Sequence, residues 1–535
     1  MLMSCVQAEP PHLTKQGSST HLIVQGKPML ILGGELGNSS ASSAAYMAPH
    51  WARLKQMHLN TVLAPVSWEL IEPQEGTFRW ESVDELITSA RANDLKLVLL
   101  WFGAWKNSMS TYVPAWVKRD QARFPRAQLP DGQSVEILSA LSSATRQADA
   151  RAFAALLGHI KAVDAQSSTV LMVQVENEIG MLPVARDYSA EANRLFHEQV
   201  PRDLLRRLAS TASADSELHQ LWKKQGGRTE GDWIAVFGEG DAAAEVFTAW
   251  HCARFVESLV EAGKAAYPLP MYVNTALNRP GKAPGEYPSG GPLPHLFDVW
   301  KAGAPSLDLL APDIYFPNFL DLAARYTRPD NPLFIPEANR AGAAEVPANA
   351  FYAFGALGAL GFSPFSIESV DDRQLDPLPR AYTLLEQLTP AILAAQGTGR
   401  IAGFRPRVQY DGTVTDKPVT AILGPYRFTV SFVDTQAPQS EQNLASHGGL
   451  IIQVGPEEYL VAGAGMIVTF DPVPTADGSV PGHAGIDSDW EGSFDARGAW
   501  TPGRLLNGDQ THQGRHLRLA PGEFQIQRVR LYSYR

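Results

Sequence analysis

The sequence predicts an α/β fold, a (β/α)8 TIM barrel, followed by a C-terminal all-β sandwich domain. Eight short apolar runs recur up to residue 367, and stretches with helical periodicity lie between them. Strands that alternate with helices pair in parallel through right-handed crossovers, so eight such units predict a closed barrel. The eight runs are residues 29–34, 60–64, 95–101, 169–175, 271–274, 307–313, 333–336 and 362–367.

The elements of the barrel follow in order along the chain. Residues 21–24 and the turn Gly26-Lys27-Pro28 precede the first run, which predicts an opening hairpin. Long insertions follow the third, fourth and fifth runs, where loops after the strands form the active site of a barrel. An open doubly wound sheet is the alternative, but Gly33-Gly34-Glu35-Leu36-Gly37 matches its phosphate turn poorly. The expected helices cover residues 46–57, 83–92, 148–162, 243–266 and 348–360.

From about residue 398 the pattern changes to short β-branched or alternating segments separated by turns such as Asp411-Gly412 and Pro521-Gly522. Such spacing is typical of a β-sandwich. The expected strands cover residues 408–410, 426–433, 450–454, 459–462, 466–470 and 524–534. We therefore expect a flexible leader over residues 1–20, a catalytic barrel over 21–395 and the sandwich over 396–535.

The composition excludes several classes of protein. The net charge of -11 and the absence of a run of five basic residues argue against nucleic-acid binding. No stretch of about 18 apolar residues is present, so no transmembrane segment is expected. Two cysteines exclude a disulfide framework, and Cys252 is expected to be a buried apolar side chain. Leu2-Met3-Ser4-Cys5 resembles the end of a bacterial lipoprotein signal, which predicts a periplasmic or cell-envelope location; an incidental cysteine is the alternative.

Two glutamates follow apolar runs that face each other across the predicted barrel. Glu178 follows Asn177 at the end of the fourth run, and Glu337 ends the seventh. Opposed carboxylates suit glycosidic cleavage, because one protonates the leaving oxygen while the other attacks or stabilises the oxocarbenium-like carbon. Either residue alone has a simpler explanation as a solvated loop acid. The pair, with Asn177 beside it, favours a catalytic site.

At this point the sequence resembles a known family. Asn177-Glu178 and Glu337 match the pattern of clan A glycoside hydrolases, and residues 60–78 are similar to the N-T-V…W…E-P…G-x-F block of families 35 and 42. Residues 174–180 resemble the Q-V-E-N-E-Y-G block of family 35 β-galactosidases, with Ile179 in place of the aromatic residue. The resemblance covers roughly residues 20–395, and the β module resembles a domain appended to a bacterial branch of family 35.

The resemblance implies that Glu178 is the acid/base, Glu337 the nucleophile and Asn177 a partner of the sugar 2-hydroxyl. Retention of configuration then requires carboxyl groups about 5–5.5 Å apart. Two positions depart from the family pattern: Pro65 replaces a common Tyr, and Ala104 replaces an acid. Both positions normally help to hold galactose, so glucose, mannose or arabinose is an alternative sugar.

Other side chains at the predicted strand ends are candidates for substrate contacts, because aromatic rings stack on sugar faces and polar groups bind hydroxyls. Tyr315 could also donate a hydrogen bond to Glu337. Each candidate has an alternative role. The tryptophans could pack between loops, and Glu35 could be a solvated loop acid. Asn274 and Glu368 could form hydrogen bonds with backbone groups. The predicted substrate-binding residues are Asn177, Glu35, Trp68, Trp105, Asn107, Asn274, Tyr315 and Glu368.

The resemblance therefore implies a retaining exo-β-galactosidase that acts on an oligosaccharide without a cofactor, and the bacterial branch implies a substrate such as a galactosylated xyloglucan fragment. No metal site is expected, because His512 and His516 are separated by Gly514, which argues against a helix that presents both. A carbohydrate-binding protein without catalysis is the alternative from another class. It would gain nothing from two mutually repelling carboxylates. The oligomeric state is not determined, and a homodimer is one compatible state.

Overall fold

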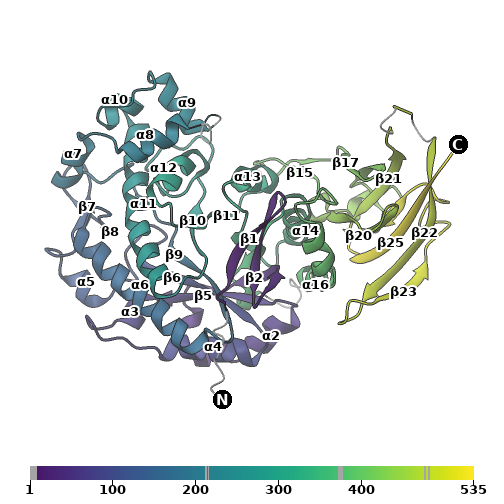
Figure 1. Cartoon of the computed structure of the whole chain (residues 1–535), viewed down its shortest axis with the longest axis horizontal. Coiled ribbons are helices and arrows are strands. Elements are labelled where there is room, and N and C mark those ends of the chain that lie inside the picture. The colour runs from purple at the N-terminus through teal and green to yellow at the C-terminus, as the bar shows by residue number, and fades with distance from the viewer. Residues whose placement is uncertain (1–8, 211–213, 215, 371–376, 475–477, 480–481) are drawn as a thin grey trace, which may run out of the picture. The chain divides into compact units, whose positions relative to one another are not determined.

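The computed structural model describes all residues except 1–8, 211–213, 215, 371–376, 475–477 and 480–481 (Figure 1). Internal contacts divide the chain into two compact units. The first comprises residues 38–51 and 62–313 together with the N-terminal segment up to His12, and the second comprises residues 13–37, 52–61 and 314–535. Each is described below by its own elements.

Eight strands close into a barrel, which confirms the predicted fold class. Their order is β10-β11-β12-β13-β4-β5-β6-β9, and the parallel pairing of β10 with β9 completes the circle. Every strand overlaps one of the eight apolar runs of the sequence. The strands are β4 (Ile31–Glu35), β5 (Thr61–Ser67), β6 (Lys96–Lys106), β9 (Val170–Asn177), β10 (Met271–Ala276), β11 (Leu309–Ile314), β12 (Ile335–Arg340) and β13 (Gly361–Phe365).

The helices between the strands lie close to their expected positions. The helix expected over 46–57 is divided into α1 (Ala44–Met47) and α2 (Trp51–Gln56). Ser142 begins α6 because its side chain accepts a hydrogen bond from the Thr145 N–H, as in a standard N-cap. The other helices of the expected set are α4 (Glu81–Ala92), α6 (Ser143–Asp164), α11 (Asp241–Ala266) and α14 (Val346–Ala356).

The sequence did not predict the content of the long insertions. The loop after β6 carries α5 (Ala115–Arg119) and the hairpin of β7 (Arg126–Gln128) and β8 (Ser134–Leu138). Four short helices fill the insertion between β9 and β10, and further helices follow β10, β11 and β13. They are α7 (Ala190–Phe196), α8 (Arg202–Ala209), α9 (Glu217–Lys224), α10 (Trp233–Phe237), α12 (Phe297–Gly303), α13 (Phe319–Tyr326) and α16 (Pro377–Ala395).

The N-terminal segment corrects the expected flexible leader over residues 1–20. Residues 12–16 form β1 (His12–Gln16), which joins β2 (Ser19–Val24) and β3 (Lys27–Met29) in a three-stranded sheet. Main-chain hydrogen bonds hold such a strand even where its side chains are polar. The turn at Gly17 has a φ of +58, and a Cβ there would meet the carbonyl oxygen of Gly397 at 2.1 Å. The expected hairpin forms between β2 and β3, and the barrel begins after Leu30.

The C-terminal part forms the expected sandwich. One sheet has the order β14-β19-β20-β25-β22-β23, and a second has the order β17-β18-β21-β24. Side chains from both sheets, such as Phe428 and Tyr459, belong to one buried cluster. The strands are β14 (Ile401–Phe404), β17 (Val419–Leu423), β18 (Tyr426–Ser431), β19 (Gly448–Gln453), β20 (Glu458–Ala464), β21 (Met466–Pro472), β22 (His483–Phe494), β23 (Trp500–Leu505), β24 (Leu517–Leu519) and β25 (Gln525–Tyr534), with a small hairpin of β15 (Arg407–Val408) and β16 (Val414–Thr415).

The structure describes one of the two cysteines. Cys252 is buried in α11, as expected. Cys5 lies outside the described residues, so lipidation and the cell-envelope location stay predictions. Within the described residues, no helix combines the length and the apolar character that a membrane crossing requires.

Candidate active site

Glu178 lies directly after β9, where the strand ends at the mouth of the barrel. Its φ of +46 and that of Glu176, +60, place both residues in the left-handed region, which non-glycine residues adopt at a cost of about 1–3 kcal/mol. Its backbone N–H donates to Asn274 Oδ1 over 3.0 Å. Only 8% of the side chain surface of Glu178 is exposed. The backbone is therefore held so that a carboxyl group enters a nearly closed space.

The carboxyl group of Glu178 is surrounded by polar groups from neighbouring strands of the first unit. Asn107, after β6, donates through Nδ2 to Glu178 Oε2 over 2.5 Å. Asn274 of β10 donates through Nδ2 to Asp313 Oδ2 over 2.7 Å, and Asp313 is hydrogen-bonded to the Glu178 side chain. Two predicted contact residues, Asn107 and Asn274, therefore contact or position Glu178.

Burial raises the pKa of Glu178 above its ordinary value. The positive charge of Lys106 and the hydrogen bonds from Asp313 and Asn107 oppose this effect but do not cancel it. A carboxyl group with a raised pKa stays protonated closer to neutral pH, which is the property that a general acid needs.

In the second unit, Glu337 lies in β12 and is also nearly buried. The hydroxyl of Tyr315, which follows β11, donates to Glu337 Oε1, so the structure contains the contact that the sequence suggested. An O–H donor stabilises the ionised form of a carboxyl group. Tyr315 is 40% exposed, so its ring also has a face open to a ligand.

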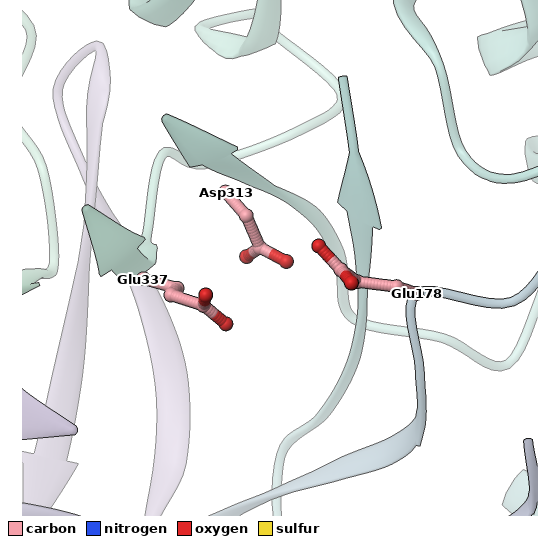
Figure 2. Close-up of side chains that lie close together, drawn as sticks. All are labelled: Glu178, Asp313 and Glu337. Carbon is pink, nitrogen blue, oxygen red and sulfur yellow. The ribbon is translucent and has the colours of Figure 1, made fainter. Parts of the chain in front are cut away.

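Glu178, Asp313 and Glu337 form a cluster of three carboxyl groups at the ends of barrel strands. Figure 2 shows the three groups pointing toward one another, and one oxygen atom of each lies within 4.8 Å of the others. The sequence analysis predicted two of the three. Oxygen ligands at this spacing are also close enough to hold a divalent cation. Glycosidic cleavage by two carboxyl groups requires no metal.

The tryptophans predicted to stack on sugars do not offer a free ring face, which corrects that prediction. Trp68 is fully buried, packs edge-on against Trp116 at 5.8 Å between ring centroids, and donates through Nε1 to Glu72. Trp105 is 1% exposed and packs against Phe255. Trp68 begins the short helix α3 (Trp68–Ile71), where its ring packs inward, and alternation of side chains along β6 turns Trp105 toward the interior packing.

The two remaining predicted contacts are buried glutamates of the second unit. Glu35 ends β4 opposite Phe365 of β13 and is 2% exposed. Glu368 accepts hydrogen bonds from the Gly37 N–H through both carboxyl oxygens, at 3.0 and 3.2 Å. Glu368 therefore has the backbone role that was its alternative, and a sugar contact by either glutamate stays a prediction.

Lys106 and Asp313 are site residues that sequence reasoning missed. Lys106, at the end of β6, is 5% exposed and donates through Nζ to Asn177 Oδ1 over 3.0 Å. Asp313, in β11, is 2% exposed. Asp313 ends the sixth apolar run, which is the signal that identified Glu178, so the same rule would have found it. Lys106 lies five residues beyond the third run, because β6 extends past the apolar residues, and the rule does not reach it.

Comparisons with known proteins point to β-galactosidases. The model of glycoside hydrolase family 42, described as "Beta-galactosidase", matches residues 43–222, a range that contains Glu178. The model of a domain of unknown function, DUF5597, matches residues 378–518, which covers most of the sandwich. No curated protein matches the chain.

Among solved structures, the chain is similar to the β-galactosidase of the psychrophilic Marinomonas ef1, with 14% identity, a TM-score of 0.46 and coverage of 68% of this chain and 60% of that chain. The cold-adapted β-galactosidase of Rahnella sp. R3 has 16% identity and a TM-score of 0.47, with coverage of 74% of this chain and 59% of that chain. The catalytic domain of a β-amylase from Paenibacillus polymyxa has 11% identity and a TM-score of 0.45, with coverage of 64% of this chain and 94% of that chain. The chain thus spans about 60% of the length of these two β-galactosidases.

The comparisons correct the expected family. The matching family model is that of family 42, so the assignment to family 35 is wrong. The block over residues 60–78 is common to both families and lies inside the matched range. The assignment therefore depended on residues 174–180, where Ile179 already departed from the family 35 motif.

Proposed function

We propose that this protein is a retaining β-galactosidase of the family 42 type. The observation that carries the proposal is the pair Glu178, directly after β9, and Glu337, within β12, on two strands of one closed barrel, with one carboxyl oxygen of each within 4.8 Å. Retaining glycosidases need carboxyl groups about 5–5.5 Å apart, whereas inverting enzymes need roughly 6.5–9.5 Å to admit a water molecule. The approach of one Glu178 oxygen to within 4.8 Å of a Glu337 oxygen favours the shorter of these two separations, and with it double displacement.

The mechanism assigns one role to each carboxyl group. Glu337 attacks the anomeric carbon as the glycosidic C–O bond breaks, and Glu178 donates its proton to the leaving oxygen. Water then attacks the glycosyl-enzyme ester, and Glu178, now ionised, takes its proton. Glu337 leaves as a carboxylate, and the sugar is released with its original anomeric configuration.

The raised pKa of Glu178 and the Tyr315 hydroxyl on Glu337 support this division of roles. Burial favours the protonated form of Glu178, while the hydrogen bond favours the ionised form of Glu337. The position of Asn177 directly before Glu178 supports a hydrogen bond from its amide group to the sugar 2-hydroxyl, a contact that strengthens as the transition state forms.

The description of the matching family model supports galactose as the sugar. Pro65 and Ala104 are both buried, and the Ala104 N–H donates to Asp149, so neither position offers the Tyr or the acidic side chain of the family pattern to a sugar. Exo action, a galactosylated xyloglucan fragment as substrate, and a homodimer stay predictions of the sequence.

The experiment is release of p-nitrophenol from a panel of aryl β-glycosides, with Glu337→Gln alongside the unchanged protein. We expect turnover of the galactoside, and a loss of at least about 10³-fold in the variant because the nucleophile is removed. Preference for glucoside, mannoside or arabinoside would retain the mechanism and change the sugar. Absence of turnover on every sugar, or full activity in the variant, would contradict the proposal.

A further inference from the structure

The strand β6 ends in a tight turn over residues 106–109, which we call the Lys106 turn. Lys106 and Met109 exchange both backbone hydrogen bonds, at 2.8 and 3.0 Å. The two residues between them, Asn107 and Ser108, have φ values of +50 and +63. Two central residues with positive φ are the mark of a type I′ turn, in which asparagine is well tolerated and serine is strained. Such strain persists where the surrounding structure enforces it, and often at functional sites.

Three consecutive side chains of the Lys106 turn bind the catalytic segment after β9. Lys106 Nζ donates to Asn177 Oδ1 over 3.0 Å. Asn107 Nδ2 donates to Glu178 Oε2 over 2.5 Å, and Ser108 Oγ donates to the Glu178 carbonyl over 2.9 Å. The turn thus holds the backbone of Glu178, its carboxyl group and the neighbouring amide at once.

The contact from Lys106 fixes which atom of the Asn177 amide faces outward. An ammonium group can only donate, so the amide oxygen of Asn177 must face Lys106 and the NH₂ group must face away. Asn177 Nδ2 is fully buried and has no hydrogen-bond partner among the described residues. A buried donor without an acceptor costs about 1–3 kcal/mol, which a hydroxyl oxygen of the substrate would recover.

We propose that the Lys106 turn positions the acid/base segment for catalysis, with Lys106 as the positioning residue that presents the Asn177 NH₂ group to the substrate. This inference rests on the proposed function. It assigns to Lys106 a role in selecting a sugar whose hydroxyl can accept a hydrogen bond at that point.

Lys106 also contributes charge to the surroundings of Glu178. The ionisable groups that face the Glu178 carboxyl are Lys106 from β6, Asp313 from β11 and Glu337 from β12. Lys106 is the cation of this set, and its charge lowers the pKa of Glu178 against the effect of burial. An opposite charge within about 4–6 Å shifts a carboxyl pKa by roughly 1–3 units. Loss of the ammonium group would therefore raise the pKa of the acid/base.

The test compares Lys106→Met with Lys96→Met. Lys96 begins the same strand and donates to the Ser167 and Ser168 carbonyls at the opposite end, so it is a matched control for loss of a partly buried lysine. In Lys106→Met, kcat/KM for the aryl galactoside should fall on the order of 100-fold, mostly in kcat, because the reacting groups lose their positions. The alkaline limb of the pH profile should move to higher pH, because the charge that lowers the pKa of Glu178 is lost. Lys106→Arg should restore part of kcat/KM and part of the original pH profile. Lys96→Met should change neither kcat/KM nor the pH profile.

An aryl 2-deoxygalactoside distinguishes a lost position of the Asn177 amide group from a general loss of activity in Lys106→Met. Because this substrate lacks the hydroxyl that pairs with Asn177, Lys106→Met should reduce its turnover about tenfold less than it reduces turnover of the galactoside. Equal losses on both substrates with an unmoved pH profile would overturn the inference.

Crystal structures of the unchanged protein and Lys106→Met provide a readout that needs no turnover. We expect the Asn177 and Glu178 side chains to move in Lys106→Met and to stay in place in Lys96→Met. Unmoved side chains in Lys106→Met would overturn the inference. Absence of turnover by the unchanged protein would instead contradict the proposed function.

Discussion

Glu176→Gln is expected to stabilise the protein increasingly as the pH rises. Glu176 and Asp149 form a fully buried carboxyl pair behind the catalytic segment. Both oxygens of Asp149 accept hydrogen bonds, from Trp101 Nε1 and the Ala104 N–H, each at 2.8 Å. Glu176 accepts one, from the Trp105 N–H, and shares the other hydrogen bond with Asp149. The proton of the pair therefore belongs on Glu176.

Burial, followed by the charge of Asp149, raises the pKa of Glu176 well above its ordinary value of 4.5. A carboxyl group whose pKa is raised by folding contributes stability that is fully present below pH 4.5 and is lost as the pH rises toward the folded pKa. Each pH unit in this window removes about 1.4 kcal/mol from the free energy of unfolding.

Glutamine keeps the hydrogen bonds without a titrating proton, because its NH₂ group can donate to Asp149 and its oxygen can accept from Trp105. The stability difference between Glu176→Gln and the unchanged protein should therefore grow as the pH rises from 4.5 toward the folded pKa of Glu176, by up to about 1.4 kcal/mol per pH unit. Urea unfolding followed by tryptophan fluorescence at three pH values measures it. Asp149→Asn is the matched control and should destabilise at every pH, because the two N–H donors approach different oxygens and one of them would face the NH₂ group. A difference that does not vary with pH would refute the shared proton.

Four further outcomes are expected. Tyr315→Phe should lower kcat on the aryl galactoside by about 10–100-fold with the protein still folded, since Glu337 loses its O–H donor; unchanged kcat would exclude this role. Burial raises the pKa of Cys252 to about 12, so iodoacetamide at pH 8 should leave it unmodified in the folded protein, as read by mass spectrometry. Phe428→Ala should lower the stability of the sandwich by about 3–5 kcal/mol in calorimetry, because Phe428 is fully buried in its core. Activity should survive EDTA, because two carboxyl groups carry the reaction; loss that a divalent cation restores would point to a metal on the carboxyl cluster.

The barrel was predictable from the sequence because each of its strands is buried on both faces. In β9 every residue is buried, so the strand is a continuous apolar run apart from its functional end. The long strand β22 lacks such a run, since its side chains are mostly polar and partly exposed. It is held between β25 and β23 by main-chain pairing, which leaves little trace in the side-chain pattern.

Glu178 and Glu337 were found because they follow apolar runs of the sequence, and the same criterion explains why Lys106 was missed. Strand ends identify which residues reach the mouth of the barrel, but not which side chains meet there. The contact of Lys106 with Asn177 depends on the register of β6 and β9, which pairs these two residues after a bulge. Trp105 is one position earlier, so alternation turns its ring into the packing around Phe255.

Azide rescue of variants with a truncated glutamate tests the roles of Glu178 and Glu337 most directly. Azide needs no general base, so it can replace the missing partner at the anomeric carbon. Glu178→Ala should form a β-galactosyl azide, because azide attacks the glycosyl-enzyme from the free face, and Glu337→Gly should form the α-galactosyl azide by direct displacement. The anomers, read by NMR, would confirm the acid/base and the nucleophile together. Exchanged anomers, or no azide product from either variant that turns over an activated galactoside, would contradict the account.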